Sequence, residues 1–130
     1  MDKLLTGRHI LVVEDEMLVL MMAEDCLADM GCEHVSVAAT VAQALTQIGS
    51  NHFDAAMLDI NLDGDRSDAI ADELAAEGVP FMFATGYGKP GIRDQDQHRP
   101  VLTKPYQLSD MEALFERLLP RGETLPLPAE

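Results

Sequence analysis

The residues best suited to chemistry are three acids, a threonine and a lysine in four separate motifs. Glu14 and Asp15 lie in ILVVEDE, Asp59 in AMLDINLDG, Thr85 in FATGY and Lys104 in LTKPY. Clustered carboxylates repel one another and need a cation, and oxygen ligands suit Mg²⁺. A lysine adds a positive charge, and a threonine adds a hydroxyl donor, for phosphoryl oxygens. Together these groups would support phosphoryl transfer to a carboxylate, with an acyl phosphate as product.

The elements that must position these groups are short apolar runs, each ending at one of the motifs. Strands are predicted over residues 9–13, 54–58, 80–84 and 101–103, with a weaker strand over 34–38. Because helical stretches alternate with them, the pattern predicts right-handed crossovers and a parallel sheet. The carboxyl ends of parallel strands lie at one edge of the sheet, where ligands bind in such folds. All five polar residues are therefore expected at that edge.

The spacing of apolar residues predicts the helices, over residues 16–30, 41–49, 67–77 and 108–119. Thr40 is placed to cap the second of them. In the first helix, three methionines are expected in the core rather than on a binding surface: Met21, Met22 and Met30.

The stretch from residue 86 to residue 100 departs from this pattern. It holds three glycines and two prolines, and Ile92 is its one large aliphatic residue. Such a composition does not favour a stable amphipathic helix. A helix in this stretch would be the fourth in chain order, before the one at 108–119. We expect it to be short or mobile, and phosphorylation could order it.

Size and charge restrict the class of protein. A chain of 130 residues suits one domain, expected over 8–119 between an N-terminal extension (1–7) and a Pro-rich disordered tail (120–130). The net charge of −14 argues against direct nucleic-acid binding, which needs a basic surface. The N-terminus is too short and polar for a signal peptide, and no apolar run could span a membrane. A cytoplasmic protein is expected.

The two cysteines, Cys26 and Cys32, show no C-x-x-C or metal-ligand spacing. We expect them to be reduced structural thiols, as is usual inside cells.

Taken in order, the four motifs resemble those of response-regulator receiver domains of the CheY-like superfamily, across roughly residues 8–119. The resemblance implies an α/β, flavodoxin-like fold: a five-stranded parallel sheet in the order 2-1-3-4-5 with helices on both faces. It also implies a two-component phosphorelay in which Asp59 accepts a phosphoryl group from a histidine kinase or a histidine phosphotransfer protein. Beyond weak self-phosphorylation and self-dephosphorylation, such a domain is not an enzyme. Its output would be a downstream protein target.

The resemblance also assigns roles at the site. Asp15 and Asp59 would bind Mg²⁺, with Glu14 reaching it through water and the backbone carbonyl of Asn61 completing the ligands. Next to the metal, Lys104 would pair first with the acceptor carboxylate and then with the phosphoryl group.

Thr85 would turn toward a phosphoryl oxygen, and a cis bond between Lys104 and Pro105 is frequent in such domains. One departure concerns signalling: the family usually has Tyr or Phe where this chain has Val101, so the aromatic residue that usually works with the threonine is replaced here. The FATGY motif without that aromatic residue resembles a single-domain receiver subgroup of alphaproteobacteria.

Several alternatives remain open from the sequence. The output could be a binding switch or a phosphoryl relay, and a phosphate-independent pseudo-receiver is a third class. Residues 59–64 also match the first half of an EF-hand loop, but Ile70 stands where the closing glutamate should be.

Overall fold

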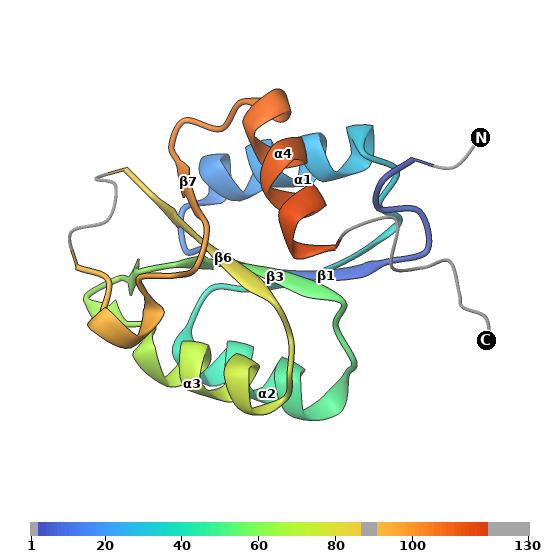
Figure 1. The fold of residues 1–130 in the computed structure, drawn as a ribbon. Helices are drawn as coiled ribbons and strands as arrows, with labels where there is room; N and C mark the ends of the chain where they lie inside the picture. The colour runs from blue at the N-terminus through green and yellow to red at the C-terminus, as the bar shows by residue number, and fades with distance from the viewer. Residues whose placement is uncertain (1–2, 87–90, 120–130) are drawn as a thin grey trace.

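A computed structural model describes residues 3–86 and 91–119 as a single central sheet covered by helices (Figure 1). Its five strands are all parallel to their neighbours and run in the order β2-β1-β3-β6-β7. This is the predicted order 2-1-3-4-5. The strands are β1 (His9–Val13), β2 (His34–Ala38), β3 (Ala55–Asp59), β6 (Phe81–Thr85) and β7 (Val101–Thr103).

Helices of the described residues cover both faces of the sheet, as predicted (Figure 1). On one face lie α1 (Met17–Asp29) and α4 (Leu108–Leu118), and on the other lie α2 (Val41–Ser50) and α3 (Asp68–Ala76). No helix in the part of the chain that the structure describes is long and apolar enough to cross a membrane.

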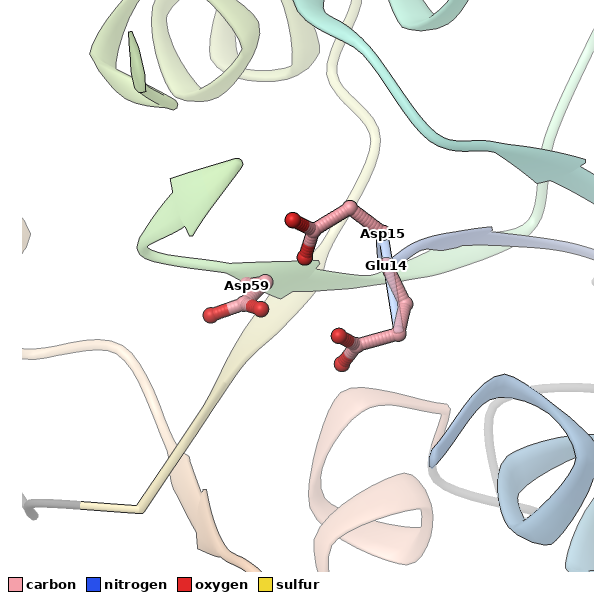
Figure 2. A group of neighbouring side chains, drawn as sticks. All are labelled: Glu14, Asp15 and Asp59. Carbon is pink, nitrogen blue, oxygen red and sulfur yellow. The ribbon is translucent and has the colours of Figure 1, made fainter. Parts of the chain in front are cut away.

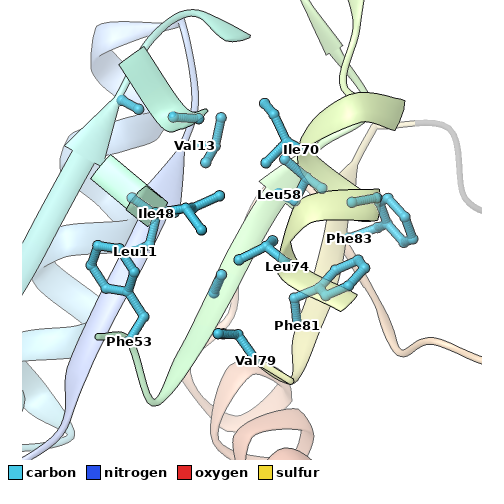
Figure 3. Packing of buried hydrophobic residues seen from close by; sticks show 14 of the residues in the cluster. Leu11, Val13, Ile48, Phe53, Leu58, Ile70, Leu74, Val79, Phe81 and Phe83 are labelled. Atoms are coloured by element: carbon cyan, nitrogen blue, oxygen red, sulfur yellow. The ribbon is translucent and has the colours of Figure 1, made fainter. Parts of the chain in front are cut away.

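Each face has its own hydrophobic core, because successive strand side chains point to opposite sides. In β1, Leu11 and Val13 join the core beneath α2 and α3, and Ile10 and Val12 join the core beneath α1 and α4. Figure 3 shows the α2–α3 core. The predicted N-terminal extension contributes to the opposite core, since Leu5 is fully buried there.

The prediction that the α1 methionines are buried is wrong for two of the three. Met30 is buried, but Met21 is 50% and Met22 is 38% exposed. The neighbouring Met17 and Leu18 are also exposed, so the first half of α1 carries an apolar face that nothing in the described residues covers.

The physical reason is that the start of α1 is apolar on every side. Its sequence, MLVLMMA, offers two apolar stripes, and the one that packs on the sheet runs through Val19, Ala23 and Leu27. Spacing alone cannot choose between two apolar faces of one helix.

The predicted cap of α2 is confirmed. The Thr40 hydroxyl accepts a hydrogen bond from the Gln43 backbone N–H at 3.1 Å, and the Gln43 side chain accepts one from the Ala39 N–H at 2.8 Å. This pair of bonds fixes the turn between β2 and α2.

Asp59 is followed by a two-stranded antiparallel hairpin, formed by β4 (Asn61–Leu62) and β5 (Asp65–Arg66). Asp63 and Gly64 form its turn, with φ values of 51° and 93°. A two-residue turn with positive φ at both positions favours the Asp-Gly sequence. The hairpin follows β3 rather than a helix, and Ile70 is buried in the core, so the EF-hand alternative does not hold.

The stretch expected to hold a short or mobile fourth helix contains, within residues 91–100, one 3-10 turn: η1 (Asp94–Asp96). Residues 87–90 and the predicted tail at 120–130 lie outside the described residues. Cys26 and Cys32 are free thiols, in agreement with the sequence prediction.

Candidate functional site

The three candidate metal-binding acids meet at the carboxyl ends of two neighbouring strands. Glu14 and Asp15 follow β1, and Asp59 is the last residue of β3. One carboxylate oxygen from each lies within 4.8 Å of the others. Figure 2 shows the three carboxyl groups arranged around one common space.

The three acids differ in how much water reaches them. Glu14 is buried, with 2% of its surface exposed, whereas Asp15 is exposed and Asp59 lies between these extremes. Glu14 and Asp15 are consecutive and leave the end of β1 in opposite directions (Figure 2). The backbone N–H of Glu16 donates to Glu14 Oε2 at 3.2 Å and helps to hold the buried carboxylate.

Lys104 brings a positive charge into this group of acids from the end of β7. Its Nζ lies 2.8 Å from Glu14 Oε1 and 3.1 Å from Asp59 Oδ2, and it donates a hydrogen bond to Asp59. The Lys104 backbone N–H donates to the carbonyl of Thr85, which joins the ends of β6 and β7. The bond between Lys104 and Pro105 is cis, as the sequence resemblance implied.

Burial and charge together shift the ionisation of these groups. Burial raises the pKa of Glu14, and the negative charge of Asp59 raises it further, against the opposing effect of Lys104. For Lys104, burial works to lower the pKa, but the contacts with Glu14 and Asp59 outweigh it and the pKa is raised. The ammonium therefore stays charged, and Glu14 has less than its usual tendency to ionise.

A pocket of about 480 Å³ opens at this edge of the sheet. Its lining includes five of the residues singled out in the sequence: Asp15, Asp59, Asn61, Thr85 and Lys104. Glu14 lies behind them, buried against Lys104. The structure thus brings all six candidate residues to one place.

Sequence reasoning missed other groups at the pocket, which are Glu16, Ile60, Gly86 and Gly91. The position of Glu16 and Ile60 beside the motif acids could have shown the first two. Gly91 gave no signal, because the path of a loop leaves no periodic pattern in the sequence. Tyr106 was also missed: it is buried, and burial and the nearby acids raise the pKa of its phenol.

The donor set fits Mg²⁺. It is made of oxygen atoms only, and three acids face one lysine, so a divalent cation would relieve the excess negative charge.

Comparison with known proteins agrees with this geometry. Residues 10–116 match the response regulator receiver domain family. The chain belongs to this family. A receiver domain is a phosphorylatable signalling module of two-component systems rather than a true enzyme, and an acidic cluster of this kind is typical of its Mg²⁺ site.

Among solved structures, the receiver is similar to SdrG from Sphingomonas melonis Fr1. The two share 40% sequence identity with a TM-score of 0.79, over 89% of this chain and 98% of that one. The BeF3-activated conformation of SdrG, from Pseudomonas melonis Fr1, is 38% identical with a TM-score of 0.75, over 92% of this chain and 99% of that one. A relative that adopts a BeF3-activated conformation supports phosphorylation-based signalling in this receiver.

Two larger proteins contain a similar domain. The anti-anti-sigma factor PhyR from Bartonella quintana is 26% identical with a TM-score of 0.75, and the match covers 90% of this chain and 49% of that one. Transcription factor SKN7 of Saccharomyces cerevisiae is 29% identical over 123 residues, which is 87% of this chain and 19% of that protein. The receiver therefore spans about half of PhyR and a fifth of SKN7.

Proposed function

We propose that this chain is a cytoplasmic, stand-alone response regulator that takes a phosphoryl group onto Asp59 from a histidine kinase or a histidine phosphotransfer protein. The observation that carries the proposal is the position of Lys104 Nζ, 3.1 Å from Asp59 and 2.8 Å from Glu14, beside a cluster of three carboxylates. The likeness to SdrG, which covers 98% of that chain, supports a stand-alone receiver of the same alphaproteobacterial subgroup.

In the proposed reaction, an oxygen of the Asp59 carboxylate attacks the phosphorus of a phosphohistidine. The P–N bond breaks, the imidazole leaves with the electron pair and an acyl phosphate forms. Lys104 stays charged and shifts from the carboxylate toward a phosphoryl oxygen, and the Thr85 hydroxyl donates to another. Glu14, Asp15, Asp59 and the Asn61 carbonyl would hold Mg²⁺, which neutralises charge on the transferred group.

The exposed apolar face of α1 supports a protein as phosphodonor. Met17, Leu18 and Met21 are at least half exposed, and α1 begins two residues after Asp15. A histidine-bearing partner that covers these side chains would bring its phosphoryl group next to the pocket.

The output is proposed to be partner binding or onward phosphotransfer. The name of PhyR, an anti-anti-sigma factor, describes a protein that acts through other proteins, which favours partner binding here. A long-lived acyl phosphate would support a binding switch, and rapid return of the phosphoryl group to a histidine would support a relay.

The experiment is phosphoryl uptake read by intact mass. Wild-type protein with a small phosphodonor and Mg²⁺ should gain about 80 Da, and chelation of Mg²⁺ should prevent the gain. Asp59→Asn should gain nothing, whereas Asp110→Asn, on the exposed surface of α4, should behave as wild type. Equal labelling of Asp59→Asn would refute the acceptor assignment.

A further inference from the structure

The hairpin formed by β4 and β5 follows Asp59, at the end of β3, and hydrogen bonds hold its base. Ser67 closes its base, because its backbone N–H and its hydroxyl both donate to the Ile60 carbonyl, at 2.9 and 3.0 Å. Within the hairpin, Asn61 is the cross-strand partner of Arg66. A displacement of the Asn61 backbone must therefore move Arg66 with it.

Arg66 joins this hairpin to two other segments. Its guanidinium donates to both carboxylate oxygens of Asp68, at 2.8 and 3.1 Å, and so holds the first turn of α3. The same guanidinium donates to the backbone carbonyl of Gly91 at 2.6 Å. Gly91 lines the pocket around Asp59, so Arg66 connects two walls of that pocket.

Arg93 continues the network into the segment that follows Gly91. It donates to Asp72 of α3 at 2.8 Å and to Asp96 of η1 at 2.9 and 3.0 Å, and it lies 3.6 Å from Asp68. Asp96 is buried, which is unusual for an acid and fits a structural role.

Isolated surface ion pairs contribute little to stability, but bidentate pairs within a network are stronger. Here two arginines and three aspartates, Asp68, Asp72 and Asp96, connect the hairpin, α3 and the segment from Gly91 to Asp96. These contacts offer a path by which a change at the Asp59 hairpin can reach the segment after Gly91. β7 of this receiver carries Val101 in place of the usual Tyr or Phe.

We propose that Arg66 couples the Asp59 hairpin to the Gly91–Asp96 segment, so that phosphorylation of Asp59 alters the surface that this segment presents to a partner. The coupling rests on the proposed function of Asp59. Physically, the Asn61 backbone carbonyl would help to hold the cation, so a charge added at Asp59 would displace the Asn61 backbone, and Arg66 would pass the displacement to the Gly91 carbonyl. Arg66 acts as a positioning residue and does not touch the phosphoryl group.

The test is to add Mg²⁺ and beryllofluoride, a phosphoryl mimic, to isotopically labelled protein and follow backbone amide signals. In the wild type, signals of Asp59, Ile60 and residues 91–96 should all shift. In Arg66→Gln, the response of residues 91–96 should be lost while that of Asp59 and Ile60 persists. Because Asp68→Asn removes the carboxylate partner with little change in shape, it should give the same loss. Arg117→Gln, an equal charge change on the opposite face of the sheet, should respond as wild type.

The outcomes separate the two proposals. An undiminished response of residues 91–96 in both Arg66→Gln and Asp68→Asn would overturn the coupling and leave the Asp59 assignment intact. Loss of the Asp59 and Ile60 response in Arg66→Gln alone would also overturn it, since Arg66 would then serve beryllofluoride binding itself. Failure of the wild type to bind beryllofluoride would overturn the proposed function, and the coupling with it.

Discussion

At the scale of single residues, Lys104 is held by two acids of different character. Glu14 is buried and close to Lys104, whereas Asp59 faces the pocket. Glu14 therefore anchors the lysine in place, and Asp59 is the partner that the lysine can leave. An anchored lysine needs no large rearrangement to reach a phosphoryl oxygen.

We expect Lys104→Gln to reduce both phosphoryl uptake and thermal stability. Loss of the ammonium leaves Glu14 as a buried carboxylate without its cation, which costs about 1–3 kcal/mol. Adding Glu14→Gln should restore much of the melting temperature but not the uptake. Uptake is read by intact mass and stability by thermal unfolding. If the double variant were less stable than Lys104→Gln, the anchor interpretation would be wrong.

The two cysteines give a pH-dependent prediction. Burial is the largest cause that raises the pKa of both thiols above the ordinary value of 9.0. A thiol with a raised pKa in the folded state stabilises the fold below its unfolded pKa, and this contribution is lost as the pH rises through the folded value. Stability should therefore decrease above about pH 9, and iodoacetamide at about pH 8 should label the native thiols more slowly than the unfolded chain. Labelling of both states at equal rates would contradict this.

At this scale the sequence predicted which residues would lie together, for a clear reason. Glu14, Asp59 and Lys104 lie at the carboxyl ends of strands of one parallel sheet, so the fold class alone places them together. The contact between Arg66 and Gly91 joins the short hairpin to a loop residue 25 positions further along the chain. Loop paths depend on turn geometry and on through-space bonds, and apolar spacing records neither.

At the scale of elements, the N-terminal cap of α2 is a local interaction whose contribution to stability can be measured. Thr40→Ala should destabilise the protein by about 1 kcal/mol, because it removes the acceptor for the Gln43 N–H. Thr46→Ala, on the exposed side of the same helix, should be neutral or slightly stabilising, since alanine favours helices more than threonine does. Chemical denaturation of the three proteins measures the difference. Equal midpoints for wild type and Thr40→Ala would show that the cap contributes nothing.

The elements also show where pattern-based prediction fails. Strands, helices and the Thr40 cap were predicted because each has a local signature. The exposed face of α1 was mistaken for core because both sides of its first two turns are apolar. The hairpin after Asp59 was not predicted, although the Asp63-Gly64 pair is a hairpin turn signal, because its strands have only two residues each and show no apolar alternation.

At the scale of the whole molecule, charge dominates. The net charge is −14, and three of the acids face one another at the site. Millimolar Mg²⁺ should therefore raise the melting temperature, because a cation that binds the folded state shifts the equilibrium toward it. Sodium chloride at the same ionic strength should raise the melting temperature less, since it only screens the repulsion between the acids. Asp15→Asn should weaken the Mg²⁺ effect and leave the salt effect unchanged. A shift that Mg²⁺ and sodium chloride produce equally would mean no specific site.

The two cores on either side of the sheet share no side chains. Changes in the α2–α3 core, such as Leu74→Ala, and changes in the α1–α4 core, such as Phe115→Leu, should therefore combine additively to within about 0.5 kcal/mol. Substitutions can then accumulate in one core during evolution without requiring compensating changes in the other. Under the proposed function, the face that carries the apolar side of α1 can change with its phosphodonor, while the face that carries α3 and Arg93 changes independently with the protein that binds the phosphorylated receiver.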